Sequence, residues 1–156
     1  MSPTDNYGSE VDALLAMLES ASQHAKLGKW QDTLGLCRQV LAKDKDNVFA
    51  LYLAGIASFQ TEAAEMAIQY LSASIQETES DTSKLSILAS LLLEAGRTDT
   101  AMPYLERWVV VSPTSESINQ LAVAYARLNR IGDAIIQFRR SLALQPDNNI
   151  ASAGLY

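Results

Sequence analysis

Apolar residues recur every three or four positions along most of the chain, which is the spacing that gives a helix one buried face. The stretch "RIGDAIIQFRRSLALQPDNN" (residues 130–149) shows this pattern, with Ala134, then Phe138 four residues later and Pro146 eight residues beyond that. Runs that favour β-strands are scarce, and "WVVV" at residues 108–111 is the main exception. Nearly half of the 156 residues are apolar. The pattern therefore predicts an all-α protein with a substantial core.

The same pattern recurs along the chain at a spacing of 33 or 34 residues. At two of the three shifts Ala134 falls on another alanine and at the third on a threonine, and at each shift Phe138 falls on a residue suited to a core. The aligned pairs are Ala101 with Leu105, Ala67 with Leu71, and Thr33 with Cys37. The chain therefore divides into four units, each predicted as two short amphipathic helices with a break between them. Their approximate bounds are residues 14–47, 48–81, 82–114 and 115–148.

Two of the expected helix boundaries are unusual. The second unit has only "QTEAAE" at its break, which is a weak turn signal, so its two helices are expected to be longer or less sharply separated. In the third unit, proline at Pro103 is tolerated best in a first helical turn. The helix that contains Pro103 is therefore expected to start near Thr100.

The repeated pattern resembles the tetratricopeptide repeat family. The resemblance covers about 135 of the 156 residues and is best in the last unit. The first unit departs most, because Thr33 and Lys45 replace the small residue and the proline of the family pattern. The resemblance implies a right-handed α-solenoid of four helix-turn-helix repeats, with the first helix of each repeat lining the concave face. A plain helical bundle is the alternative fold. In the last unit the residues that match the family are Leu121, Ala122, Tyr125, Ala134, Phe138 and Pro146.

The two ends of the chain lie outside the four units. Ser9 is followed three residues later by Asp12, a start similar to a capping box, so the first helix is expected to begin near Glu10. Residues 1–8 are predicted to be a disordered tail, and residues 9–156 form the repeat domain. Residues 149–156 are interpreted as the start of a truncated cap or of a fifth repeat.

Charge and hydropathy exclude several functions. The net charge is −6, and no basic stripe suggests a nucleic-acid surface, since the pair Arg139 and Arg140 is typical of a solvated helix face. The N-terminus is polar and acidic, unlike a secretory signal. No apolar run approaches the roughly 20 residues of a membrane span. We therefore expect a cytoplasmic protein that binds neither nucleic acid nor a membrane.

Catalytic chemistry is not indicated by the pattern. His24 and Cys37 are the only residues of their types, and both are expected to fill the interior of the first unit rather than to act as base and nucleophile. One histidine and one cysteine cannot form a four-ligand zinc site. The glycines are isolated, so no phosphate loop is present. We predict a protein that is not an enzyme and that needs no metal or cofactor.

The concave face is the expected binding surface, and its positions follow from helical spacing. This groove is predicted to be apolar toward the N-terminal end and polar toward the C-terminal end. Exposed aromatic clusters tend to mark contact sites. The alternative is that some of these side chains are covered by the chain itself or pack between neighbouring helices. The predicted partner-binding positions are Leu15, Leu18, Phe49, Tyr52, Ile56, Phe59, Asn119 and Arg127.

Three functions are compatible with these features. The first is a protein-interaction scaffold that binds an apolar or amphipathic segment of a protein or peptide in the groove. The second is the repeat region of a larger enzyme, such as a glycosyltransferase, sulfotransferase or methyltransferase. The third is a chaperone for a secreted apolar segment. The family's basic clamp for acidic peptide tails is not present at the corresponding positions.

The C-terminal end predicts self-association. Ile131, Ile135 and Leu142 lie on the side that a next repeat would cover, and only "NIASAGLY" follows Asn148. Repeat arrays normally end in a cap with a polar outer face. Either the chain is a fragment of a longer array, or two copies form a homo-oligomer by covering each other's ends.

Overall fold

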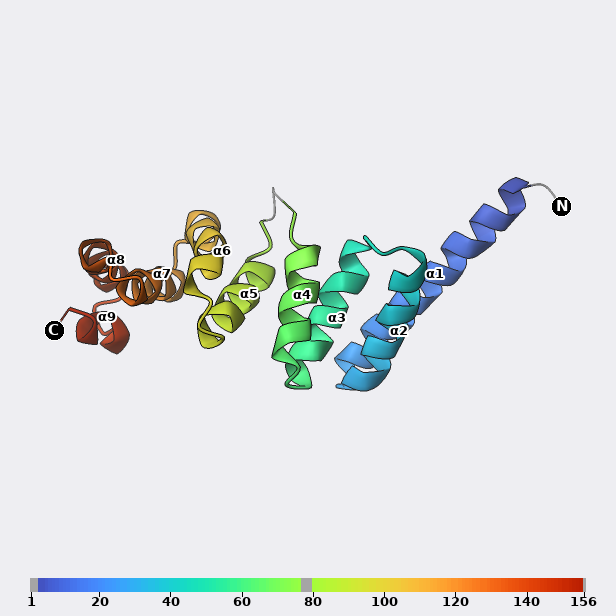
Figure 1. Ribbon diagram of the computed structural model, residues 1–156, viewed down its shortest axis with the longest axis horizontal. Helices are drawn as coiled ribbons and strands as arrows, with labels where there is room; N and C mark the ends of the chain where they lie inside the picture. Colours follow the sequence, from blue (N-terminus) through green and yellow to red (C-terminus); the bar gives the residue numbers. More distant parts are fainter. Residues whose placement is uncertain (1–2, 77–79, 156) are drawn as a thin grey trace. The chain divides into compact units, whose positions relative to one another are not determined.

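The protein is described by a computed structural model that covers residues 3–76 and 80–155, with side chains described from Glu10 onward. Every regular element in these ranges is an α-helix, which confirms the predicted all-α fold (Figure 1). The chain divides into two compact units, unit 1 (Met1–Glu77) and unit 2 (Thr78–Tyr156).

Unit 1 consists of two helical hairpins. Helix α1 (Pro3–Lys26) pairs with α2 (Trp30–Lys43), and α3 (Val48–Gln60) pairs with α4 (Ala64–Ser74). Helix α3 also packs against α2 and contacts α1. The start of α3 is fixed by Asn47, whose side chain accepts a hydrogen bond from the Ala50 amide at 3.0 Å.

Unit 2 repeats the arrangement and adds one short helix. Helix α5 (Thr82–Glu94) pairs with α6 (Thr98–Val111), and α7 (Ser115–Arg127) pairs with α8 (Ile131–Leu144). Helix α9 (Asn149–Ala153) then packs against α8. Asn148 caps α9 as Asn47 caps α3, because its side chain accepts a hydrogen bond from the Ala151 amide at 3.0 Å.

The turns inside the four hairpins share one backbone feature. Each turn contains one residue with positive φ, namely Gly28, Glu62, Gly96 and Asn129, at φ values of 71°, 59°, 71° and 58°. Their spacing along the chain is the repeat spacing found in the sequence. The second repeat, formed by α3 and α4, therefore has the same kind of turn as the other three repeats, although its sequence carries no glycine at that position.

The prediction of longer or less separated helices in the second repeat is wrong. Helix α3 ends at Gln60 and α4 begins at Ala64. Glu62 adopts the left-handed conformation despite its side chain, because the turn is closed by backbone hydrogen bonds from Ala63 N to Ser58 O at 2.9 Å and from Glu62 N to Phe59 O at 3.1 Å. Tertiary packing of the hairpin overrides the weak local turn signal.

The predicted core positions are buried in both units. The four aligned pairs, from Thr33 and Cys37 to Ala134 and Phe138, are all at most 4% exposed. In unit 1, Gly55 lets α3 approach α4 closely, since a Cβ atom there would lie 2.6 Å from Leu71 Cγ. In unit 2, a Cβ atom on Gly154 would overlap the Phe138 ring. Small residues therefore allow close contacts in both units.

Two helix starts differ from the predictions. Helix α1 begins at Pro3, not near Glu10, so residues 3–8 are its first turns rather than a disordered tail; residues 1–2 lie outside the described ranges. Proline suits the first position of a helix because its missing N–H would have no partner there.

Helix α6 begins at Thr98, two residues before the predicted start, and contains Pro103. Because proline has no N–H, the carbonyl of Asp99 four residues earlier receives no hydrogen bond from Pro103. Asp99 is an exposed residue of the first turn, so water can donate to that carbonyl instead.

Candidate partner-binding groove

An apolar stripe runs along one face of α3 in unit 1. Phe49 and Phe59 are 47% and 40% exposed, and Tyr52 and Ile56 between them are half-buried. The opposite face of the same helix is fully packed, with Ala50, Ala54 and Ala57 inaccessible to solvent. Helix α3 is therefore apolar nearly all round, and the stripe is the part that its own fold does not bury.

Helix α1 completes a cavity beside this stripe. Leu15, 53% exposed, and the half-buried Leu18 lie one turn apart on α1 and line the cavity together with Phe49. Its volume is about 510 Å³, within the range of roughly 300–1,000 Å³ that is common for ligand sites. Three of the residues predicted from sequence thus meet in one cavity, although Phe49 comes from a different repeat than the two leucines.

The rim of this cavity is polar and carries both charges. Glu19, Ser22, Gln23 and Lys26 of α1 line it together with the three apolar residues. Glu19, Gln23 and Lys26 were not among the predicted site residues, although their spacing of three or four residues from Leu15 and from one another places them on the same helix face. The combination of an apolar floor and a polar rim suits an amphipathic ligand.

The remaining residues of the stripe lie outside the lining of this cavity. Tyr52, Ile56 and Phe59 continue along α3 toward its C-terminal end, and of these three only Phe59 is exposed. Half-burial of Tyr52 and Ile56 means that these two side chains also contribute to packing within unit 1. The stripe therefore contains both exposed side chains and side chains that pack within unit 1.

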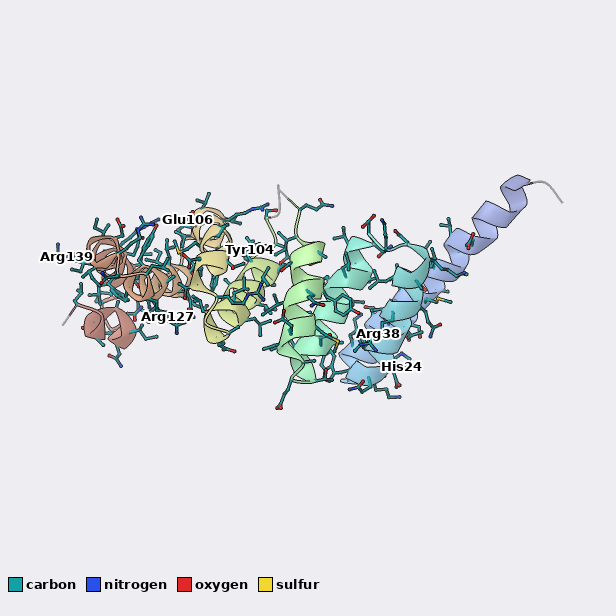
Figure 2. The ribbon with its side chains drawn as sticks, in the orientation of Figure 1. His24, Arg38, Tyr104, Glu106, Arg127 and Arg139 are labelled. Carbon is teal, nitrogen blue, oxygen red and sulfur yellow. The ribbon has the colours of Figure 1, made fainter. Side chains whose placement is uncertain are left out.

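His24 and Cys37 belong to the structure of unit 1. His24 lies near the C-terminal end of α1 (Figure 2), and its Nδ1 atom is 2.8 Å from the carbonyl oxygen of Ser20 in the preceding turn. Cys37 is inaccessible in the core cluster with Ala21 and Ala54. Burial raises the pKa of the Cys37 thiol to about 11, so it is protonated at neutral pH and is a poor nucleophile.

The two predicted groove residues of unit 2 have different surroundings. Arg127 (Figure 2) donates a hydrogen bond from Nη1 to the carbonyl oxygen of Leu93 at 2.6 Å, near the C-terminal end of α5. The same carbonyl accepts a hydrogen bond from the Gly96 amide at 3.1 Å, so Arg127 adds a second donor and a positive charge at the C-terminal end of α5, where the helix dipole favours a cation. Asn119 is only 6% exposed and lines a separate polar cavity between α7 and α9.

The predicted self-association surface is only partly open. Ile131 is 51% exposed, whereas Ile135 and Leu142 are half-buried. Leu142 packs against the core cluster of Ala134, Phe138 and Ala151, to which Leu155 also contributes. The chain after α8 therefore covers part of the surface that the last repeat would otherwise expose.

Two absences among the described side chains and helices bear on function. No group of three or more His, Cys, Asp or Glu residues among them is placed to hold a metal ion. None of the described helices has the length and apolar character needed to cross a membrane.

Solved structures place this fold among the tetratricopeptide repeat proteins. YrrB, described as a TPR protein with an unusual peptide-binding site, superposes with a TM-score of 0.84 over 97% of this chain and 79% of its own, at 18% identity. MamA (MSR-1) gives a TM-score of 0.75 over 92% of this chain and 83% of its own, at 23% identity. These likenesses confirm the tetratricopeptide repeat fold.

The family assignment rests on the sequence. The sequence profile described as "Bacterial transcriptional activator domain" matches residues 37–147, which is more than half of the chain. The chain therefore belongs to this family. A curated relative, anaphase-promoting complex subunit 7 of Arabidopsis thaliana, is 26% identical over 129 residues. That alignment covers 82% of this chain but 23% of the relative, so the chain spans under a quarter of the relative's length.

Proposed function

We propose that unit 1 binds an amphipathic segment of a protein partner, as a helix or an extended peptide, in the cavity between α1 and α3. The fold, which is that of protein-interaction scaffolds, supports a general role in protein binding. The observation that carries the finer proposal is the meeting of Leu15, Leu18 and Phe49 in one solvent-accessible cavity. Exposed apolar clusters that are rimmed by polar side chains are typical of protein contact sites.

The chemistry of the lining defines the ligand. Leu15, Leu18 and Phe49 would bury one or two apolar side chains of the partner, and an amphipathic helix presents such anchors three or four residues apart. Glu19 and Lys26 would pair with charges at the edge of the bound segment, where solvent keeps such pairs weak. Most of the binding energy would therefore come from the apolar anchors.

The family description concerns bacterial transcriptional activators. We infer that this chain contributes protein contacts rather than DNA contacts in such a setting. The net charge of −6 opposes binding to a polyanion, and Lys26 is the only cation among the described residues that line the cavity of unit 1.

A peptide-display selection against the whole chain tests the proposal. Amphipathic sequences with two apolar anchors should be enriched, and their affinity is then measured by calorimetry for the wild type and for Leu15→Ser/Phe49→Ser. We expect the double variant to lose about 2–4 kcal/mol of binding free energy. Urea denaturation should show nearly unchanged stability, because both side chains are about half exposed.

Val110→Ser is the matched control, because Val110 is an apolar side chain of unit 2 that is 81% exposed. It should bind the selected peptides as the wild type does. Equal affinities for the wild type and the Leu15→Ser/Phe49→Ser variant, with both folded, would exclude this cavity as the binding site.

A further inference from the structure

The open face of α1 carries a line of apolar and small side chains at heptad spacing. Val11, Leu15, Leu18 and Ser22 follow one another at intervals of four, three and four residues, which places them in one row along the helix. Val11 and Leu15 are 55% and 53% exposed, and Leu18 and Ser22 are half-buried. The last three line the cavity of unit 1, and Val11 continues the row one turn beyond it. These four residues form the α1 seam.

The α1 seam is not a general property of the first helices of the repeats. Two repeats further along the chain, the counterparts of the last three seam residues on α5 are Ser83, Ser86 and Ser90. The repeat fold therefore does not itself require leucine at these positions. An apolar row on an open helix face is typical of a surface on which another helix packs. The seam thus indicates a contact outside the repeat.

A column of charges lies on the solvent side of the seam. Asp12, Glu19 and Lys26 are spaced seven residues apart, so they share one face of α1. All three are exposed, and none of them forms an ion pair with another described residue. Glu10, by contrast, pairs with Lys43 of α2 at 3.6 Å and belongs to the hairpin. The column reads acid, acid, base from the N-terminal to the C-terminal end of α1.

The floor of the cavity favours a helix over an extended peptide. Leu15, Leu18 and Phe49 carry no hydrogen-bonding side-chain group, and the polar lining residues all lie on α1. An extended segment buried against this floor would leave backbone N–H and C=O groups without partners, which is unfavourable. A helix satisfies these groups internally and presents apolar anchors three or four residues apart, which matches the spacing of the seam.

We propose that the groove of unit 1 binds a single amphipathic helix of another protein, which runs antiparallel to α1. Apolar residues of that helix at heptad spacing would pack on the α1 seam and on Phe49. One acidic side chain would face Lys26, and basic side chains would face Glu19 and Asp12. This inference rests on the function proposed above, because it uses the same cavity, and it adds the conformation, the direction and the charge order of the partner.

The direction follows from electrostatics. An antiparallel partner that complements the column reads acid, base, base along its own chain. Its acid then lies toward its N-terminus and its bases toward its C-terminus, which is the order that a helix dipole stabilises. A parallel partner would need the opposite order. A second copy of α1 fits less well, because an antiparallel pair that joins Asp12 to Lys26 would bring the two Glu19 side chains together.

The test uses three helical peptides of about 21 residues, or three heptads, with blocked ends and the same apolar seam. The matched peptide carries acid, base and base in its charged column, and the inverted peptide carries base, acid and acid. The third is the matched peptide with two prolines on its solvent face, which prevent a helix but leave the groove-facing side chains unchanged. Affinities for the whole chain are measured by calorimetry.

The matched peptide should bind about tenfold more tightly than the inverted one at about 50 mM salt, and this preference should fade to about twofold or less at about 500 mM. The proline peptide should bind at least about tenfold more weakly than the matched peptide. Equal affinities of the matched and inverted peptides at low salt, or of the matched and proline peptides, would overturn the proposal. So would a matched peptide that does not bind at about 1 mM.

Charge reversal on the protein tests the same contact from the other side. Glu19→Lys should weaken the matched peptide by about threefold to fivefold and strengthen the inverted peptide by a similar factor. Glu94→Lys is the matched control, because it changes the net charge of the chain equally at an exposed residue of α5 outside the cavity. It should bind both peptides as the wild type does. The same response to both variants would show that only net charge matters, contrary to the proposal.

A nitroxide label at the N-terminus of the matched peptide reports the direction. In NMR spectra of the ¹⁵N-labelled whole chain, it should broaden the amide signals of residues 23–29 more than those of residues 10–15. The opposite result would overturn the antiparallel arrangement. Leu15→Ser/Phe49→Ser separates this inference from the proposed function. Loss of binding in that variant, together with indifference of the wild type to charge order, would leave the groove as the site and remove only the charge-ordered helix.

Discussion

The two cavities occupy equivalent places in the repeat but have opposite chemistry. A shift of 101 residues along the sequence places Leu15, Leu18 and Phe49 of the unit 1 cavity on Glu116, Asn119 and Ile150 of the unit 2 cavity. Each cavity therefore lies between the first helix of one repeat and the helix that starts the next. The helical hairpins form a cavity in both places, and the residues at a few aligned positions decide whether its lining is mainly apolar or polar and acidic.

The same shift relates the cores beneath the two cavities. It places Cys37 of unit 1 on Phe138 of unit 2, and both side chains are buried. An aligned core position can hold either cysteine or phenylalanine because neighbouring residues differ in size as well. Gly154 leaves room for the Phe138 ring, since a Cβ atom on Gly154 would overlap it. A surface column, by contrast, can change polarity with little effect on the fold.

The largest expected effect is on the core of unit 2. Phe138→Ala should lower the free energy of unfolding by about 3–5 kcal/mol, because it leaves a cavity under α9 that the backbone cannot fill. Urea denaturation followed by circular dichroism measures the change. A loss below about 1 kcal/mol would mean that Phe138 does not hold the end of the last repeat.

A second effect should appear at the equivalent position of unit 1. The folded Cys37 has a pKa of about 11, above its ordinary value of 9.0, so its contribution to stability is full below pH 9 and is lost as the pH rises toward 11. The loss should be at most about 2–3 kcal/mol. Urea denaturation at several alkaline pH values measures the slope, and Cys37→Ala should show a shallower one. Parallel slopes for the two proteins would show that Cys37 does not titrate in this way.

A smaller effect of opposite sign is expected for Asn119. Asn119→Leu removes a buried acceptor that has no partner, so the variant should be more stable than the wild type by about 1 kcal/mol. Leu18→Asn, the reverse change at the equivalent position of unit 1, should not stabilise the protein. Thermal or urea denaturation of both variants checks the pair, and destabilisation by Asn119→Leu would indicate that Asn119 has a structural partner.

The smallest effect concerns association between copies. We propose that wild-type protein at about 100 µM forms a weak dimer through the open part of the last repeat. Ile131→Glu/Ile136→Glu should abolish it without unfolding unit 2, because these side chains are 51% and 60% exposed. Leu142 is unsuitable for this test because it packs into the core. Sedimentation equilibrium that shows only monomer for the wild type would contradict the proposal.

The sequence by itself determined the repeat, its register and its core columns. These features are local or strictly periodic, since a helical face and a turn every 33 or 34 residues can be read from the order of residues alone. The apolar character of the α3 stripe was equally readable, because it follows from spacing along one helix. The start of α1 was mispredicted, since the signal at Ser9 and Asp12 is similar to a helix cap but lies inside the helix.

Only the tertiary structure decided which of these surface residues share a site. Phe49 meets Leu15 and Leu18 because α3 packs against α1, and Tyr52, one turn further along, does not line that cavity. Arg127 is engaged with the Leu93 carbonyl, and Asn119 is buried without a partner for Oδ1, and neither fact can be seen in helical spacing. Such details depend on the distance between helices, which is set by packing across residues far apart in the chain.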